Sequence, residues 1–268
     1  MYQLFEWQAF LDTCNDDTKP RKHNNSRTNG EYFAGTKSYE ETMQFASNGW
    51  PQGLNAVKEV IANTSTTMGR SLGLQYDVAG FAPDIAAYCA GDPCHMMQKG
   101  DVFSATTRVI TLKVNGCFNA GVQQETVVNR GVAIMGIVDY LEANDVRVEL
   151  TYCSGNKSKG ARFDYEVIIK RAEDPLDRDR AIFALANPSV HRRMFFHLIE
   201  RDPNFKHWCS EAYGIPVELT EDTIDDAVYI PSANRGDYFS VEKSILTVLP
   251  YFECVLSSEQ IEQIKDEI

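Results

Sequence analysis

The sequence predicts an α/β protein whose sheet is mostly parallel and doubly wound. The main observation is residues 108–153, whose hydrophobic pattern predicts a strand, a polar turn, a long amphipathic helix and a second strand. This order is a βαβ unit, and such units build parallel sheets. A further strand is expected at residues 162–170, where the apolar run Val167–Ile169 favours an inner position in the sheet.

Within this unit the strands are expected at residues 108–114 and 147–153, with the helix at 125–144. Ligands of open parallel sheets bind at the carboxyl ends of the strands. The turn at residues 115–124 is therefore the place where a functional site is expected.

The flanking segments contain helix and strand signals of their own. Residues 1–107 are expected to form a helical layer packed on the sheet, and residues 108–268 the α/β core, as one compact unit. Ser38 and Glu41 form a capping box that begins a helix. The other elements expected are helices at 54–62 and 84–90, a helix starting near Asp174, a helix at 190–200 capped by Ser189, a strand at 227–230 and a terminal helix after Ser257.

Composition indicates a folded protein without a membrane span. The chain of 268 residues has 43% hydrophobic and 24% charged residues, as globular proteins do. It contains no apolar run of about 18 residues, and its N-terminus lacks the pattern of a secretory signal, so a cytoplasmic location is expected. The 7 scattered cysteines do not resemble a disulfide framework, and buried thiols are expected.

The charge is distributed unevenly. Of the formal net charge of −12, most falls in residues 211–268, which hold 13 acidic and 3 basic residues. The remainder is nearly neutral, which leaves room for a local basic groove that meets nucleic acid. Two basic segments are candidates, although a solvated loop would have the same composition. Their candidate residues are Arg21, Lys22, Arg27, Lys157, Lys159 and Arg162.

Residues 108–170 resemble the start of a von Willebrand factor A-like domain. In that family the first strand ends in Asp-x-Ser-x-Ser, which helps to hold a magnesium ion, and the matching positions here are Asn115, Cys117 and Asn119. Magnesium favours charged oxygen ligands, so an amide and a thiol at these positions remove the matched donors. We therefore expect a degenerate site with no metal and no cofactor.

Other chemistry is disfavoured by spacing. The turn after residue 114 lacks a dinucleotide or phosphate-loop glycine pattern. Cys89, Cys94 and His95 could be zinc ligands, but without a second pair a buried thiol pair is favoured. The histidines adjoin no nucleophile motif, and the carboxylates at 174–179 fit a helix start better than a hydrolase site. No enzyme is expected.

Three segments, residues 45–50, 77–80 and 90–93, resemble a group of poorly characterised phage-encoded proteins. A weaker resemblance is to the single-stranded-DNA-binding cofactors that recruit a phage RNA polymerase. These resemblances imply a phage-type protein in the host cytoplasm that binds single-stranded DNA and recruits a phage or host RNA polymerase. The alternative is a von Willebrand A-like scaffold for protein interaction, and self-association stays open.

Overall fold

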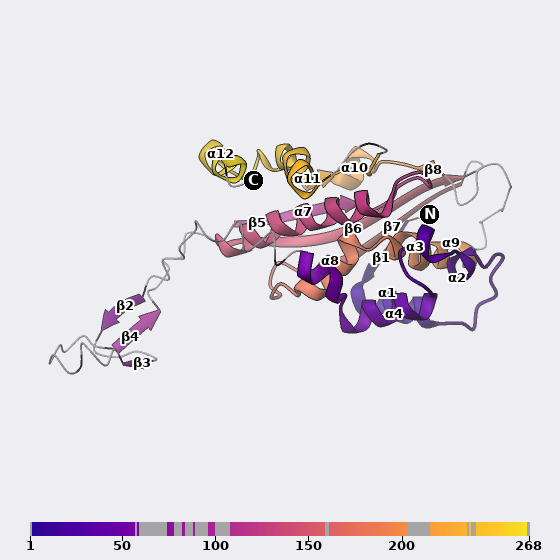
Figure 1. Ribbon diagram of the computed structural model, residues 1–268, viewed down its shortest axis with the longest axis horizontal. Coiled ribbons are helices and arrows are strands. Elements are labelled where there is room, and N and C mark those ends of the chain that lie inside the picture. Colours follow the sequence, from indigo (N-terminus) through magenta and orange to yellow (C-terminus); the bar gives the residue numbers. More distant parts are fainter. Residues whose placement is uncertain are drawn as a thin grey trace.

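The computed structural model describes residues 2–56, 58, 74–77, 82–83, 88, 96–99, 108–158, 161–202, 215–234, 236 and 240–266. Its main sheet is six-stranded, with the order β1-β7-β6-β5-β9 and with β8 paired to β6 (Figure 1). The strands are β1 (Tyr2–Glu6), β5 (Arg108–Asn115), β6 (Val146–Ser158), β7 (Ala161–Lys170), β8 (Ile215–Pro216) and β9 (Val228–Ile230). The predicted α/β class with a mostly parallel sheet is confirmed.

The central βαβ unit is also confirmed. Strand β5 lies parallel to β6 along its whole length, from Arg108 opposite Val146 to Asn115 opposite Cys153. Between them runs α7 (Gln124–Ala143). The other parallel pairs are β5 with β9 and β1 with β7. The end of β5 therefore lies inside the sheet, where β6 and β9 flank it.

Strands β6 and β7 form an antiparallel hairpin, which corrects the basic loop expected before residue 162. Strand β6 continues past Cys153 to Ser158, which pairs with Ala161. The polar run in this part of β6 is typical of a loop, but the side chains of Ser154 and Asn156 are buried and hydrogen-bonded to each other. Lys157 is consequently a strand residue, and Arg162 lies opposite it.

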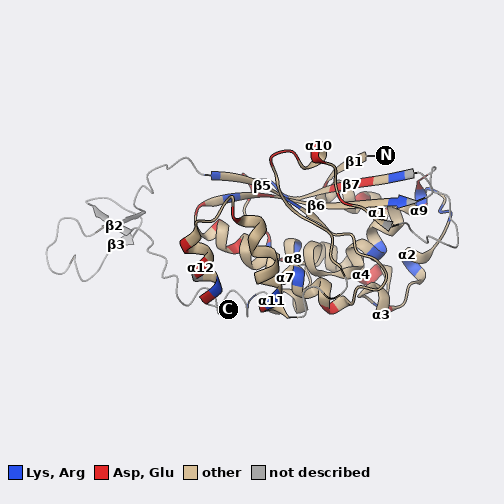
Figure 2. Cartoon of the chain, turned by 90° about the horizontal axis from the view of Figure 1, so that it is seen from above, with Lys and Arg blue, Asp and Glu red and all other residues tan. Residues whose placement is uncertain are grey.

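Most helices lie on one face of the sheet, α7, α8 (Arg178–Ala186), α11 (Val241–Val248) and α12 (Ser258–Asp266) among them (Figure 2). On the opposite face, the short helix α10 (Glu221–Ile224) lies over the sheet. A doubly wound sheet would carry helix layers on both faces, so in the described part the layering differs from that prediction. The physical reason is the β6–β7 hairpin, which takes the place of a second crossover helix.

The N-terminal layer contains helices and one strand that the pattern did not indicate. Tyr2–Glu6, expected among the helices, forms the edge strand β1, and its Phe5 packs against the core. The capping box is confirmed, because the Ser38 hydroxyl accepts a hydrogen bond from the Glu41 amide at 3.1 Å. The helices are α1 (Trp7–Asn15), α2 (Asn25–Thr28), α3 (Glu31–Ala34) and α4 (Tyr39–Asn48).

The helix predicted at 54–62 is helical at residues 54–56 and 58, and that at 84–90 is described only at residue 88, which is helical. Their other residues lie outside the described ones, as do Cys89, Cys94 and His95. A separate antiparallel sheet is made by β2 (Leu74–Asp77), β3 (Ala82–Pro83) and β4 (Met96–Lys99).

The helix predicted at 190–200 begins differently. Val190–Phe195 forms a π-helix, η1, that continues into α9 (Phe196–Arg201). Ser189 makes no cap, and its hydroxyl is buried without a hydrogen-bond partner. Every residue of η1 is buried, including the basic ones, so the segment is not amphipathic. Such π-helical segments are rare and occur frequently at functional sites.

The remaining predicted starts hold in part, because the helix expected to start near Asp174 begins at Arg178. Asp177 caps α8 by accepting a hydrogen bond from the Arg180 amide at 3.0 Å, which confirms that this acidic run begins a helix. Strand β9 ends before Pro231, and Ser257 caps α12 through the Gln260 amide at 3.2 Å. Helix α11 leads into the 3₁₀ turn η2 (Leu249–Phe252). No described helix has the length and apolar character needed to cross a membrane.

One hydrophobic core joins the N-terminal layer to the sheet. Phe195 of η1 stacks on Tyr152 of β6 with ring centroids 5.2 Å apart, and it contacts Phe10 of α1 at 5.0 Å. Trp7 and Phe183 continue this aromatic cluster toward α8 at 6.4 Å. The aromatic contacts hold η1 between α1 and the strand ends.

The close crossing of α7 and α8 generates a prediction about stability. A β-carbon at Gly131 would lie 2.4 Å from the Cα of Ala186, which requires the two helices to move apart. Gly131→Ala should therefore lower the free energy of unfolding by about 1–3 kcal/mol, measured by urea denaturation. Gly30→Ala, where no atom lies within 4 Å, is the control and should change it far less. Equal stability of the two variants would contradict the crossing.

Candidate functional site

The side chain of Asn115, at the carboxyl end of β5, is fully buried in a hydrogen-bond network. Its amide nitrogen donates to Glu218 Oε2 and to the Tyr229 hydroxyl, both at 3.0 Å, and to the Val217 carbonyl at 3.1 Å. Its amide oxygen accepts from the Cys117 amide at 3.1 Å. Asn115 thus ties the turn to the segment that leads to β9.

Glu218 is the charged centre of this network. Its carboxylate also accepts from the amide and hydroxyl of Ser232 and from the Tyr229 hydroxyl. Burial alone raises the pKa of the Glu218 carboxyl, but hydrogen bonds from Ser232, Tyr229 and Asn115 outweigh it and hold the pKa below its ordinary value. Sequence reasoning missed these partners, because nothing in the pattern links residues so far apart.

Cys117, the second position of the degenerate motif, is enclosed by polar side chains. Its Sγ lies 3.2 Å from Ser154 Oγ, 3.6 Å from Asn156 Nδ2 and 3.8 Å from His191 Nδ1. Burial raises the pKa of the Cys117 thiol to about 12, and burial followed by the charge of Arg192 lowers the pKa of His191 to about 3. A neutral thiol therefore faces a neutral imidazole at pH 7, whereas a cysteine nucleophile requires a thiolate.

Asn119, the third position, lies at a pocket of about 230 Å³ on the helix-bearing side of the strand end. We call it the ring pocket, because four aromatic rings line it. They come from Phe33, Phe118, His191 and Phe196. The other lining residues are Asn25, Asn29, Asn119, Ala120, Asn156, Arg192 and Pro216.

Arg192 forms part of the pocket wall. Its guanidinium lies 4.1 Å from the ring centroid of Phe33 and 4.6 Å from that of Phe118. It donates to the Val122 carbonyl at 2.9 Å and to the Phe33 carbonyl. Burial lowers the pKa of Arg192 to about 10, so it stays charged at pH 7. The π-helix places Arg192 and His191 side by side at this wall.

The second basic segment lies beside the ring pocket but is partly neutralised. Arg162 donates from Nε to Asp164 at 2.7 Å and from Nη2 to the Glu218 carbonyl at 2.9 Å. Lys157 is exposed on β6, next to Asn156 of the pocket wall. Lys159 is outside the part of the chain that the structure describes. Of these candidates, Lys157 is the exposed cation.

The first basic segment reaches the ring pocket from the other side, since Asn25 and Asn29 come from α2 and its end. Arg21 and Arg27 both form ion pairs with Asp17, at 2.6 and 2.9 Å. Lys22 is exposed, and its amide donates to the Glu200 carbonyl at 3.0 Å. Basic residues from both segments therefore lie at the end of the molecule that holds β6, β7, α2 and α9 (Figure 2).

Among the residues described, no three His, Cys, Asp or Glu side chains cluster as a metal site.

The network around Glu218 predicts a pH dependence of stability. The folded pKa lies below the ordinary value of about 4.3, so the carboxylate stabilises the fold above that pH and its contribution is lost as pH falls through the folded pKa. Glu218→Gln should cost about 1–2 kcal/mol at pH 7 and less at acidic pH, measured by urea denaturation over a pH series. Glu221→Gln, an exposed glutamate on α10, is the control. A cost that is the same at every pH would contradict the charged network.

Comparison with known proteins assigns the chain to a family whose function is unknown. No curated protein matches this chain, and no solved structure matches it either. The fold class therefore rests on strand order and pairing. The chain belongs to the family described as a domain of unknown function (DUF7192), whose model matches residues 1–254.

Proposed function

We propose that this chain is a non-enzymatic protein that binds single-stranded DNA and holds an unpaired base in the ring pocket. The observation that carries the proposal is the lining of that pocket, which combines aromatic rings with side-chain amides at the carboxyl end of β5. Bases stack on aromatic rings in single-strand binders, and amides pair with their polar edges. The basic candidates lie outside the pocket lining, but Lys157 follows Asn156 of the pocket wall in β6 and Lys22 precedes Asn25 in the chain. A strand whose base enters the pocket would pass these positive charges with its phosphates.

The size and charge of the pocket favour one planar group over a larger ligand. About 230 Å³ is below the range of pockets that take drug-sized molecules, roughly 300–1,000 Å³. Arg192 covers one face of Phe33 and one face of Phe118 and places its charge at the wall. A base would stack on the ring faces that Arg192 does not cover. A base attached to a flexible strand fits this combination.

Binding is favoured over catalysis by the protonation of the buried groups. Cys117 and His191 are the closest approach to a nucleophile and base at this site, at 3.8 Å. The raised pKa of the thiol and the lowered pKa of the imidazole oppose the thiolate that such a pair would need. Asn115, Cys117 and Asn119 also bring no carboxylate to the strand end.

The von Willebrand A-like relationship belongs to this proposal. Taking β5 as the first strand, the order β7-β6-β5-β9 corresponds to the 3-2-1-4 part of the doubly wound order. A degenerate member would keep this scaffold and bind at the same edge without a metal. We further propose that the protein is phage-encoded.

Recruitment of a phage or host RNA polymerase would use the acidic C-terminal quarter. Helix α12 and the segment before it expose Glu253, Glu259, Glu262 and Asp266. Figure 2 shows the acidic residues of α12 in red, far from β1 and α9. A surface of this charge can meet a basic partner while the other end holds DNA.

Removing one ring tests the base pocket. Phe33→Leu keeps apolar volume but removes a stacking face, so affinity for a fluorescent single-stranded oligonucleotide should fall roughly 5- to 30-fold in anisotropy titrations at low salt. Tyr32→Leu removes a ring that is 83% exposed on the same helix and outside the pocket, and it should bind as wild type does. If the wild-type protein does not bind the oligonucleotide at low salt, the proposal is refuted.

The second candidate is a protein-interaction scaffold, which the edge strand β1 favours. Among the described strands, β1 pairs with β7 alone, and it exposes Tyr2 (55%) and Leu4 (52%). An open edge with apolar side chains can accept a strand from a partner.

This candidate predicts a different sensitivity to substitution. Leu4→Lys should abolish co-purification of a bound protein partner, because charge at an edge strand opposes added strands. Charge reversal at Lys157 and Lys159 should leave the same complex intact. The opposite pattern would favour binding at the basic end instead.

A further inference from the structure

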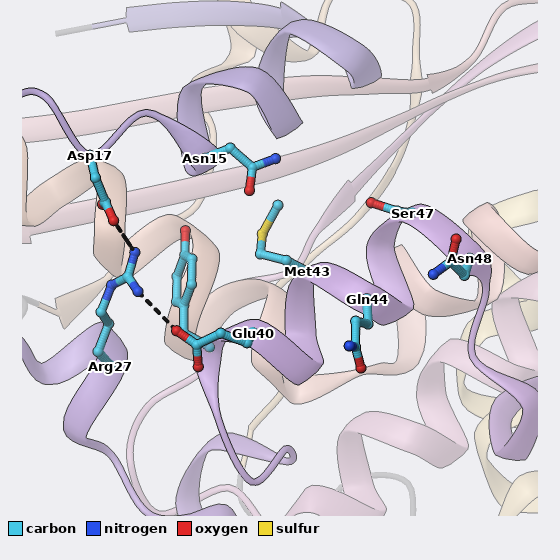
Figure 3. Close-up of a pocket in the computed structure, with 9 residues that line it drawn as sticks. Asn15, Asp17, Arg27, Glu40, Met43, Gln44, Ser47 and Asn48 are labelled. Atoms are coloured by element: carbon cyan, nitrogen blue, oxygen red, sulfur yellow. Dashed lines mark hydrogen bonds and ion pairs between the residues drawn. The ribbon is translucent and has the colours of Figure 1, made fainter.

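Three arginines converge on one carboxylate beside the pocket drawn in Figure 3. Asp17 accepts from Arg21 Nη2 at 2.6 Å, Arg27 Nη2 at 2.9 Å and Arg201 Nη2 at 3.0 Å. The arginines come from the α1–α2 connection, from α2 and from the end of α9. Figure 3 shows Arg27 between Asp17 and Glu40, the latter at 3.0 Å.

The Asp17 carboxylate is the most exposed of these four side chains. The Asp17 side chain is 53% exposed, whereas Arg201 and Arg21 are 5% and 19% exposed. Arg27 is also held in place, because its guanidinium lies 4.5 Å from the ring centroid of Tyr39. The guanidinium groups are therefore positioned by the fold, and Asp17 reaches them from the surface segment between α1 and α2.

The arginines have more donor capacity than their partners use. The Nε atoms of Arg27 and Arg201 are buried without a hydrogen-bond partner. His197, fully buried against the Tyr39 ring at 5.0 Å, has no partner at either ring nitrogen. A carboxylate offers two oxygens to three guanidinium groups, whereas an inorganic phosphate ion offers more oxygens and bears more charge. A backbone phosphate matches the carboxylate in charge and would exchange with it without a change in the net charge of the cluster.

The cluster is also accessible. A pocket of about 360 Å³ is lined by Asp17, Arg27, Tyr39 and Glu40, together with polar residues of α4 (Figure 3). An anion entering this pocket would reach Arg27 at once and would meet Arg21 and Arg201 where Asp17 now sits.

We propose that Arg21, Arg27 and Arg201 form a binding site for a phosphate group, and that Asp17 occupies it as an internal substitute until the ligand displaces it. Exchange of Asp17 for phosphate forms no covalent bond and leaves the three guanidinium groups in place. Glu40 keeps its ion pair to Arg27 or turns to solvent, where it is already 67% exposed. A purely structural network would instead need Asp17 in place at all times.

The phosphate can be free inorganic phosphate or a nucleic-acid backbone phosphate. The second source rests on the proposed DNA binding, and the first does not. Helix α2 joins the two sites, because Arg27 faces the arginine cluster while Asn25 and Asn29 line the ring pocket.

The test is the affinity of the folded chain for inorganic phosphate by calorimetry, against chloride at equal ionic strength. Asp17→Asn removes the competing carboxylate, so phosphate should bind at least about 5-fold more tightly. Asp12→Asn makes the same charge change at an exposed aspartate of α1 and should leave affinity unchanged. Arg21→Gln, with the carboxylate retained, should weaken phosphate binding about 5-fold or more. Phosphate affinity that is unaltered in both Asp17→Asn and Arg21→Gln would overturn the proposal.

A thymidine oligonucleotide distinguishes the sources. If Asp17→Asn tightens both phosphate and oligonucleotide binding, the site holds a backbone phosphate. If only phosphate binding tightens, the site takes the free anion, and the DNA proposal is left to the ring-pocket test. If wild type binds the oligonucleotide but neither Asp17→Asn nor Arg21→Gln changes either affinity, the phosphate site is refuted while DNA binding stands. Should Asp17→Asn fail to fold, the Arg21→Gln comparison decides.

Discussion

The structure depends on the burial of Arg193, whose charge must be satisfied without water. Its guanidinium donates to the hydroxyl and carbonyl of Thr36, both at 2.8 Å, to the Ser26 carbonyl at 3.0 Å and to the Asn29 carbonyl at 2.8 Å. A buried guanidinium with fewer partners would cost several kcal/mol, so these bonds are a condition of folding. They fasten residues 26–36, which include most of the short helix α2 and all of α3, to the π-helix η1.

This constraint also creates the two hollows on either side of α2. Because Arg193 fixes residues 26–36, Phe33 is held against Arg192 and closes the ring pocket, while Arg27 is held over Tyr39 and opens on the arginine cluster. Glu200 adds a second tie, accepting from the amide and hydroxyl of Ser26. Both candidate sites thus depend on the hydrogen bonds that satisfy the buried Arg193, which hold the short helices α2 and α3 in place.

Local patterns predicted the parts of this molecule that depend on local physics. The βαβ unit, the Ser38 cap and the α8 start follow from periodicity and from side chains within one helical turn. Strand β1 did not follow, because its pairing with β7 joins residues that lie far apart in the chain, such as Tyr2 and Asp164. The π-helix could not be predicted either, because its buried arginines donate hydrogen bonds to carbonyls that lie far away in the chain. For the site, the turn at Asn115 was predicted, but the ring pocket and Asp17 cluster depend on such distant partners.

Asn115 illustrates why the end of β5 carries an amide and not a carboxylate. Its nitrogen lies 3.0 Å from the carboxylate of Glu218 and donates to it, which a carboxylate at the same position cannot do. Two carboxylates at that distance would repel each other unless a cation or a proton lay between them. Glu218 lies in the segment before β9 and bears the negative charge of this network, while Asn115 supplies hydrogen-bond donors. The amide is thus matched to its neighbour, and ligand binding is left to the surfaces on either side of α2.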